Sequence, residues 1–198
     1  MQTIAARPHA SVGNGAEVID EVEVMSALAL NGEPIRIPES ASGFSVYEMF
    51  SERNSAVALH ELPRDFRELF GGLEMSSHPA QIIQQIGIVR AVNTKRLRME
   101  FDGPCHLDCY GLYQLLRIHR LRGDAHGGLS AGNPSLPHSN GFFLLDGKGD
   151  EHCVSLRLGS ARWYLFMERP HAVTHRFSGH DKLFVPNSAL QFRRKFAS

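Results

Sequence analysis

The sequence predicts an α+β fold in which a helical N-terminal half is followed by a mainly antiparallel β-sheet. Residues 16–86 contain apolar side chains three and four positions apart, with prolines and glycines placed as helix boundaries. Residues 87–186 change to alternating apolar and polar positions and include a clear hairpin pattern around Asp146. Helices and strands that are separated along the chain in this way favour α+β over a parallel α/β fold.

The composition is that of one ordinary globular domain. The chain has 198 residues, of which 42% are hydrophobic and 21% are charged, so it is long enough to bury one sizeable core. Lys plus Arg and Asp plus Glu each total 21, which leaves no net charge to attract nucleic acid or an anionic membrane. No apolar run approaches the ~20 residues of a membrane span. Three cysteines, an odd number, and a first segment without a secretory pattern indicate a cytoplasmic protein.

The N-terminal half is expected to start with a flexible arm, residues 1–15, and to continue as a single domain over 16–198. A helix is predicted from Ala16 to Ala29, because apolar side chains recur at spacings of four and three and acidic residues gather near its start. The other elements expected here are an extended piece at 34–38, a short helix at 45–51, a strand at 55–62, a helix at 63–70 and helical turns at 79–86.

The second half is expected to form the sheet. Residues 88–92 and 97–101 are predicted to be strands on either side of a turn, while 110–121 fits either a helix or a strand. The segment 123–141 is rich in Gly, Ser, Pro and Asn and is expected to be a long loop. The remaining expected elements are the hairpin 141–145 and 153–158 around the turn 146–150, strands at 161–168 and 171–177, and a short helix or tail within 187–198.

The densest group of reactive side chains is the run Cys105-His106-Leu107-Asp108-Cys109-Tyr110. Cys105, His106 and Cys109 are soft ligands suited to zinc, and Cys153 could supply a fourth. The paired Cys-x-x-Cys or His-x-x-x-His spacings of structural zinc sites are absent, however. The simpler interpretation is that the two cysteines are small buried residues.

The same run also suits a thiol enzyme. Such an enzyme needs a cysteine whose proton is removed by a histidine, with a third group orienting that histidine. The nucleophile would be Cys105 or Cys109. The other two roles could be filled from a pool of nearby residues: His119 or His126 as base, and Asp108 or Asp124 as the orienting carboxylate.

The acidic segment 146–151 has some features of a calcium loop but is too short for one, so a hairpin turn is expected there. Local basic spots occur within 117–122 and at 193–195. They could meet phosphates, carboxylates or propionates, and the simpler interpretation is a solvated surface.

Several stretches resemble the cytosolic haem-utilisation carriers and the related haem-degrading proteins, over about residues 55–158. LHELP (59–63) and FRELF (66–70) look like that family's short helix before its first sheet. LRMEFDG (97–103) with YGLYQL (110–115) is similar to its glycine-aromatic strands, and FFLLDGKGDEH (142–152) is similar to its hairpin.

This resemblance implies reversible haem binding in a groove on an antiparallel sheet, in a protein that is usually a homodimer. A histidine or a tyrosine phenolate can bind the haem iron, and arginines can pair with the propionates. The residues that the resemblance implies as axial ligands are His106, Tyr110, His119 and His126. Those implied as propionate partners are Arg117, Arg120 and Arg122.

Three functions therefore stay open. The first is a cytoplasmic small-molecule binding protein, with haem as the leading cofactor and zinc as an alternative. The second is a non-enzymatic interaction protein, such as an effector or regulatory module, that docks through residues 1–15. The third is the Cys/His-dependent enzyme. We expect a binding protein rather than an enzyme, without nucleic acid as a partner.

Overall fold

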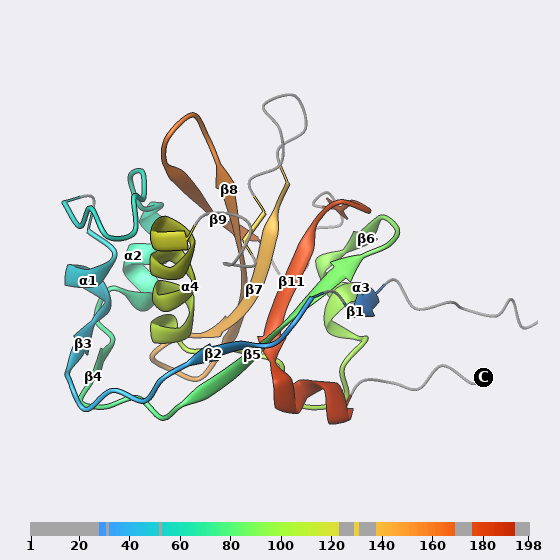
Figure 1. Cartoon of the computed structure of the whole chain (residues 1–198), viewed down its shortest axis with the longest axis horizontal. Coiled ribbons are helices and arrows are strands. Elements are labelled where there is room, and N and C mark those ends of the chain that lie inside the picture. The colour runs from blue at the N-terminus through green and yellow to red at the C-terminus, as the bar shows by residue number, and fades with distance from the viewer. Residues whose placement is uncertain are drawn as a thin grey trace, which may run out of the picture.

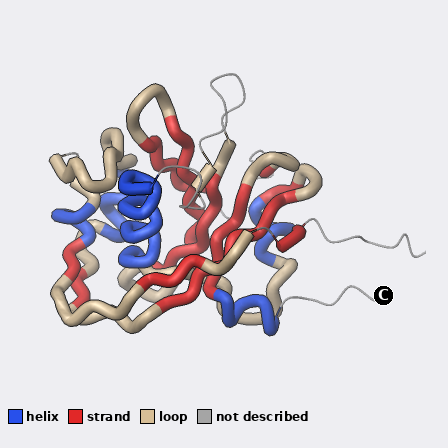
Figure 2. Tube along the Cα trace, viewed as in Figure 1, coloured by secondary structure: helices blue, strands red, loops and turns tan. Residues whose placement is uncertain are grey.

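The computed structural model describes residues 28–30, 32–51, 53–122, 129–130, 138–168 and 176–192. Its centre is a seven-stranded sheet whose pairs are all antiparallel except one, and helices lie on both sides of it (Figure 1). The α+β class and the mainly antiparallel sheet are thus confirmed. The helical N-terminal half is wrong, because helices and short strands alternate along that half (Figure 2).

The strands of the large sheet run in the order β1-β5-β11-β7-β8-β9, and β2 also pairs with β5. The single parallel pair joins β11 to β7. The bounds are β1 Leu28–Leu30, β2 Ile35–Ile37, β5 Gln81–Ile88, β7 Asn140–Leu145, β8 Glu151–Leu158, β9 Trp163–Glu168 and β11 Lys182–Pro186.

Smaller elements complete the fold. Two further pairs, β3 with β4 and β6 with β10, form two-stranded sheets. The short strands are β3 Phe44–Ser45, β4 Glu74–Met75, β6 Val92–Asn93 and β10 Arg176–Phe177. The helices are α1 Val46–Met49, α2 Arg64–Phe70, α3 Thr94–Arg98, α4 Cys109–Arg122 and the 3₁₀ helix η1 Asn187–Phe192.

Side chains alternate across the sheet and build a separate apolar cluster on each face. On β7, Phe142 and Leu144 point into the larger cluster, and Phe143 points into the smaller one, as the period of two requires. The larger cluster lies against α1, α2 and α4, and the smaller one against α3, β6 and η1. In Figure 1 these two layers lie to the left and to the right of the sheet.

Several predicted elements are confirmed. The extended piece at 34–38 contains β2, and the short helix at 45–51 contains α1. Helix 63–70 is α2, with Pro63 directly before its first residue. The hairpin of 141–158 is β7 and β8, strand 161–168 contains β9, and the ambiguous segment 110–121 is the helix α4.

Four predicted elements are wrong. The strand expected at 88–92 is interrupted: Ile88 ends β5, Val92 starts β6, and the residues between them are outside any strand. Residues 79–86 were expected to be helical, yet they contribute most of β5, whose hydrogen bonds go to β1, β2 and β11. Residues 97–101 were expected to be a strand, but α3 occupies 94–98 because Asn93 caps it: the Asn93 side chain accepts a hydrogen bond from the Arg96 N–H at 2.8 Å. Residues 55–62 form turns with a single bridge at Leu59 instead of a strand.

Other predictions fall partly or wholly outside the described residues. These are the arm 1–15, the helix from Ala16 to residue 27, most of the loop 123–141, the start of strand 171–177 and the end of the C-terminal segment. The end of that first helix can be checked, because Leu28–Leu30 is the strand β1. Among the described residues, no helix has both the length and the apolar character that a membrane crossing requires.

Candidate functional site

The longest helix, α4, starts with a cysteine. Asp108 precedes it, and its Oδ1 accepts a hydrogen bond from the N–H of Gly111 at 2.6 Å, which is the geometry of an N-terminal cap. The other carboxylate oxygen accepts a hydrogen bond from the side-chain amide of Gln81, also at 2.6 Å. Asp108 therefore ties the start of α4 to the start of β5 and fixes the position of Cys109 in the first turn.

A buried histidine lies beside this cap. The ring of His78 stacks on that of Tyr110 with centroids 3.9 Å apart, and its two ring nitrogens are buried without a hydrogen-bond partner among the described residues. Nδ1 of His78 is 4.0 Å from Oδ2 of Asp108, which is too long for a hydrogen bond. Burial lowers the pKa of His78 and outweighs the opposite effect of the Asp108 carboxylate, so His78 packs as a neutral ring.

A second polar group lies in the β7–β8 hairpin. Oδ1 of Asp146 accepts the backbone N–H groups of Lys148 and Asp150 at 2.8 and 2.9 Å, which closes the turn. Its Oδ2 lies 3.0 Å from Nε2 of His152. The hydrogen bond with His152 is the main cause that lowers the pKa of Asp146, and the two backbone N–H groups add to it. The side chain of Asp146 is only 3% exposed, so the turn holds an oriented His–Asp pair.

Cys109 and His152 lie on the same face of the sheet. The backbone N–H of Leu107 bonds to the carbonyl of Phe143, and Leu107 bridges to Leu144. Leu144 in turn pairs with His152. Neighbouring strands are ~4.8 Å apart, so the backbones of Leu107 and His152 are separated by ~10 Å, and α4 starts two residues after Leu107.

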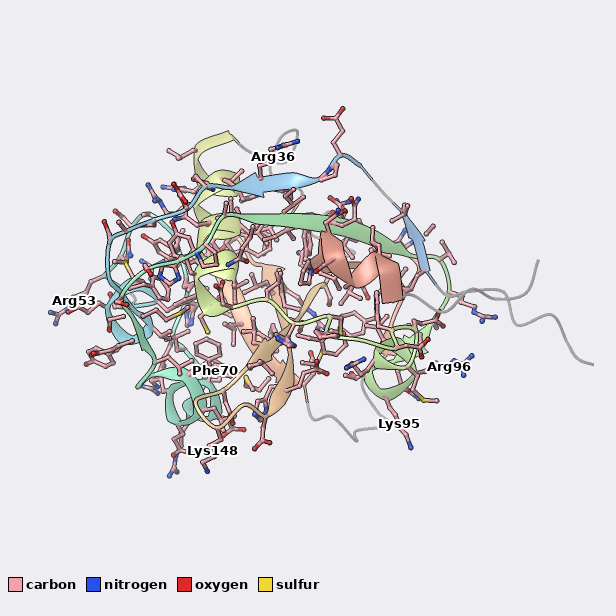
Figure 3. The ribbon with its side chains drawn as sticks, turned by 90° about the horizontal axis from the view of Figure 1, so that it is seen from below. Arg36, Arg53, Phe70, Lys95, Arg96 and Lys148 are labelled. Atoms are coloured by element: carbon pink, nitrogen blue, oxygen red, sulfur yellow. The ribbon has the colours of Figure 1, made fainter. Side chains whose placement is uncertain are left out.

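The side chains around this point belong to the larger apolar cluster. Cys109 and Leu144 are members of it, and so is Phe70 from the end of α2, whose ring centroid lies 5.7 Å from that of His152. Seen from below, Phe70 lies in the same part of the molecule as Lys148 of the β7–β8 turn (Figure 3). We call the group of Cys109, His152 and Asp146 the α4–hairpin site.

The thiol of Cys109 is buried. Its residue is 3% exposed, and burial, followed by the charge of Asp108, raises its pKa to about 12. The start of a long helix has the opposite effect, since its dipole favours a thiolate. Burial dominates here, so the resting form is the neutral thiol.

The other two cysteines lie on the opposite face, in the smaller cluster. Sγ of Cys105 is 3.9 Å from Oε2 of Glu151, a carboxylate that also meets Arg98 at 2.5 Å and His106 at 3.8 Å. Burial raises the pKa of Cys105 to about 12 and that of Cys153 well above its usual range.

The zinc interpretation needs Cys105 and Cys109 in one ligand set, and these two thiols lie in different clusters. Among the described residues, no group of three or more His, Cys, Asp or Glu side chains could hold a metal ion. The donor set present here therefore does not fit a zinc ion.

The residues implied by the haem resemblance are spread along α4. Tyr110 is 7% exposed and lies under the His78 ring, whereas the His119 ring packs edge-on against Trp163 with centroids 4.9 Å apart. Arg117 lies over the ring of Tyr113 and is seven residues, or about 10 Å, along the helix from Tyr110. Arg120 is on the last turns of α4.

His126 lies outside the described residues, as does the side chain of Arg122. Among the described axial candidates, His106 lines an open groove of about 490 Å³ between the start of β5 and the end of β11. The structure therefore does not bring the described candidates together around one haem-sized space.

The sequence singled out Cys109 but not its possible partners. The sequence pattern places His152 and Asp146 only within the hairpin segment 142–152. The sequence does contain a signal for this pair. A hairpin turn that starts with aspartate brings that side chain beside the first residues of the second strand. Six residues separate Asp146 from His152.

No protein-family model, curated protein or solved structure matches this chain. The class of protein is therefore inferred from the α4–hairpin site alone.

Proposed function

We propose that this protein is a thiol-dependent hydrolase or acyltransferase, with Cys109 as nucleophile, His152 as general base and Asp146 as the group that orients the imidazole. The observation that carries the proposal is the 3.0 Å contact between Nε2 of His152 and Oδ2 of Asp146, on the face of the sheet where α4 starts with Cys109. A nucleophile, a base and an orienting carboxylate are the three parts of this mechanism.

One of the two tautomers of His152 suits these roles. With Nε2–H donating to the carboxylate, Nδ1 of His152 keeps a lone pair and can accept a proton. It takes the proton from Sγ of Cys109, and the resulting thiolate attacks an acyl carbon. His152 then returns the proton to the leaving amine or alcohol, and a thioester forms on Cys109. Water, or another acceptor, releases the acyl group and regenerates the thiol.

The N–H groups at the start of α4 can stabilise the negative charge that develops on the acyl oxygen during this reaction. The first N–H groups of a helix have no partner within the helix. Asp108 takes the N–H of Gly111, so those of Cys109 and Tyr110 are the ones suited to a developing oxyanion. The fixed position of Asp108, held by Gln81, keeps this turn in place.

Substrate must reach a sulfur that is 3% exposed. Phe70 packs against His152 at the end of α2, so the side chains around His152 have to leave room for an acyl group. A raised pKa of about 12 keeps the thiol protonated until the site opens, which makes His152 necessary.

The test uses p-nitrophenyl acetate, an activated ester that reports acyl transfer without a known natural substrate. We expect acetylation of Cys109, identified by mass spectrometry, to be at least ten-fold faster than that of Cys105 and Cys153. His152→Gln should slow acetylation of Cys109 at least 100-fold, in line with the loss of a general base. His106→Gln, a change at a partly exposed histidine away from Asp146, is the matched control.

Equal acetylation of the three cysteines in the folded protein would contradict this function. So would a rate at Cys109 that His152→Gln leaves unchanged while the variant keeps the near-ultraviolet circular dichroism of the native fold.

A second candidate function, haem binding, is favoured by the groove that His106 lines. A one-to-one Soret shift on titration with hemin that is lost in His106→Ala and kept in His60→Ala would support it. No Soret change at stoichiometric hemin would exclude it.

A further inference from the structure

A separate cleft of about 570 Å³ opens between α1 and α2, away from Cys109 and His152. This volume lies within the range of small-molecule sites, ~300–1,000 Å³. Its inner wall is made by core aromatic and aliphatic side chains, including Phe50, Phe66 and Leu62. Tyr47, from α1, lies at the mouth and is 72% exposed, which is unusual for so large an aromatic side chain.

Charged side chains also line the cleft. Among the described residues that line it, Arg53 and Arg67 are the cations and Glu48 is the one carboxylate. Within the described part of the chain, Arg53 makes no hydrogen bond or ion pair, and its side chain extends outward beyond α1 in Figure 3.

Arg67 has a partner that a ligand could displace. Its Nη2 is 3.4 Å from Oε1 of Glu61, and the two side chains are 51% and 63% exposed. Such a solvent-exposed pair is weak, because water screens it, so an anionic ligand can replace it at small cost. Guanidinium groups bind carboxylates, phosphates and sulfonates with paired hydrogen bonds.

We propose that this cleft binds a small amphipathic anion. Its aromatic or aliphatic body would lie against Tyr47 and the inner wall, and its acidic head group would pair with Arg53 and Arg67. The charge of the lining favours an anion, because two guanidinium groups face one carboxylate among the described residues of the cleft. This inference does not depend on the reaction proposed for Cys109.

The test compares two probes with the same aromatic rings. One is 8-anilinonaphthalene-1-sulfonate, and the other is N-phenyl-1-naphthylamine, which lacks the sulfonate. We expect saturable one-to-one binding of the sulfonate in fluorescence titrations. The double variant Arg53→Gln with Arg67→Gln should weaken it at least ten-fold and leave the affinity of the uncharged probe unchanged. Tyr47→Ala should weaken both probes.

Arg36→Gln is the matched control. Arg36 is an exposed arginine on β2, at a different margin of the molecule from Arg53 in Figure 3. An Arg36→Gln loss as large as that of the double variant would show a non-specific charge effect and overturn the proposal. Equal binding by the double variant and the native protein would also overturn it, as would an equal loss for the two probes. All these substitutions are at exposed side chains, so the fold should be kept.

Discussion

Asp146 links the geometry of the β7–β8 turn to the orientation of a histidine. One carboxylate oxygen closes the turn through Lys148 and Asp150, and the other meets His152. An amide at this position could serve one of these roles but would lose the charge that His152 and the two N–H groups stabilise. The stability of the hairpin should therefore depend on pH through this one side chain.

We predict that Asp146→Asn lowers the free energy of unfolding near pH 7 and has a smaller effect in acid. The pKa of Asp146 is lowered in the folded protein, first by His152. A carboxyl group of this kind stabilises the fold above its unfolded pKa, about 3.9, and loses that effect as the pH falls through its folded pKa. Urea unfolding at pH 7 and pH 3 measures the difference. The matched change Asp150→Asn, at an exposed position of the same turn, should show no such dependence, and a gap that stayed constant with pH would disprove the assignment.

At the scale of elements, α4 depends on its cap. Helix α4 carries Cys109 in its first turn, and Asp108 holds that turn both to Gly111 and to Gln81 of β5. The contact with Gly111 caps the first turn of α4, and the contact with Gln81 fixes this turn against the sheet.

We predict that Asp108→Ala lowers the free energy of unfolding by about 1–2 kcal/mol, the usual effect of losing an N-terminal cap. Asp108→Asn keeps an oxygen for the N–H of Gly111 and should cost about half as much. Urea unfolding followed by circular dichroism measures both variants. Equal losses in the two would show that the contact with Gln81, and not the cap, is the stabilising one.

The elements that sequence reasoning predicted correctly are those with local signals. Helix α2 has Pro63 before it and Gly71 after it, and the β7–β8 hairpin has its glycine-rich turn. Residues 79–86 also start with a proline and end at a glycine, but this signal was overridden by pairing with three strands distant in sequence. At α3, the cap by Asn93 was missed because Leu97, Met99 and Phe101 alternate as in a strand.

The candidate site was predictable only in part for the same reason. Cys109 is visible in the sequence as one of a group of reactive residues, but its place on the same face of the sheet as His152 depends on the bridge between Leu107 and Leu144. That bridge joins residues 37 positions apart, and spacing along the chain does not reveal it.

For the whole molecule, one sheet separates two apolar clusters. Leu116 of α4 is fully buried in the larger cluster, and Leu183 of β11 is fully buried in the smaller one. The strands supply side chains to both, as Phe142 and Phe143 do from adjacent positions. Because the same strands supply side chains to both clusters, disruption of one cluster also disturbs the strands against which the other packs.

We therefore predict that the described fold unfolds as one cooperative unit. Leu116→Ala and Leu183→Ala should each lower the free energy of unfolding by about 2–5 kcal/mol, the range for buried leucines. The single tryptophan, Trp163, belongs to the larger cluster, so its fluorescence reports one face while far-ultraviolet circular dichroism reports the whole chain. Leu183→Ala should move both signals to the same lower denaturant midpoint. A fluorescence midpoint that stayed at its native value in Leu183→Ala would mean that the two faces unfold independently, and that the α4–hairpin site does not depend on the smaller cluster.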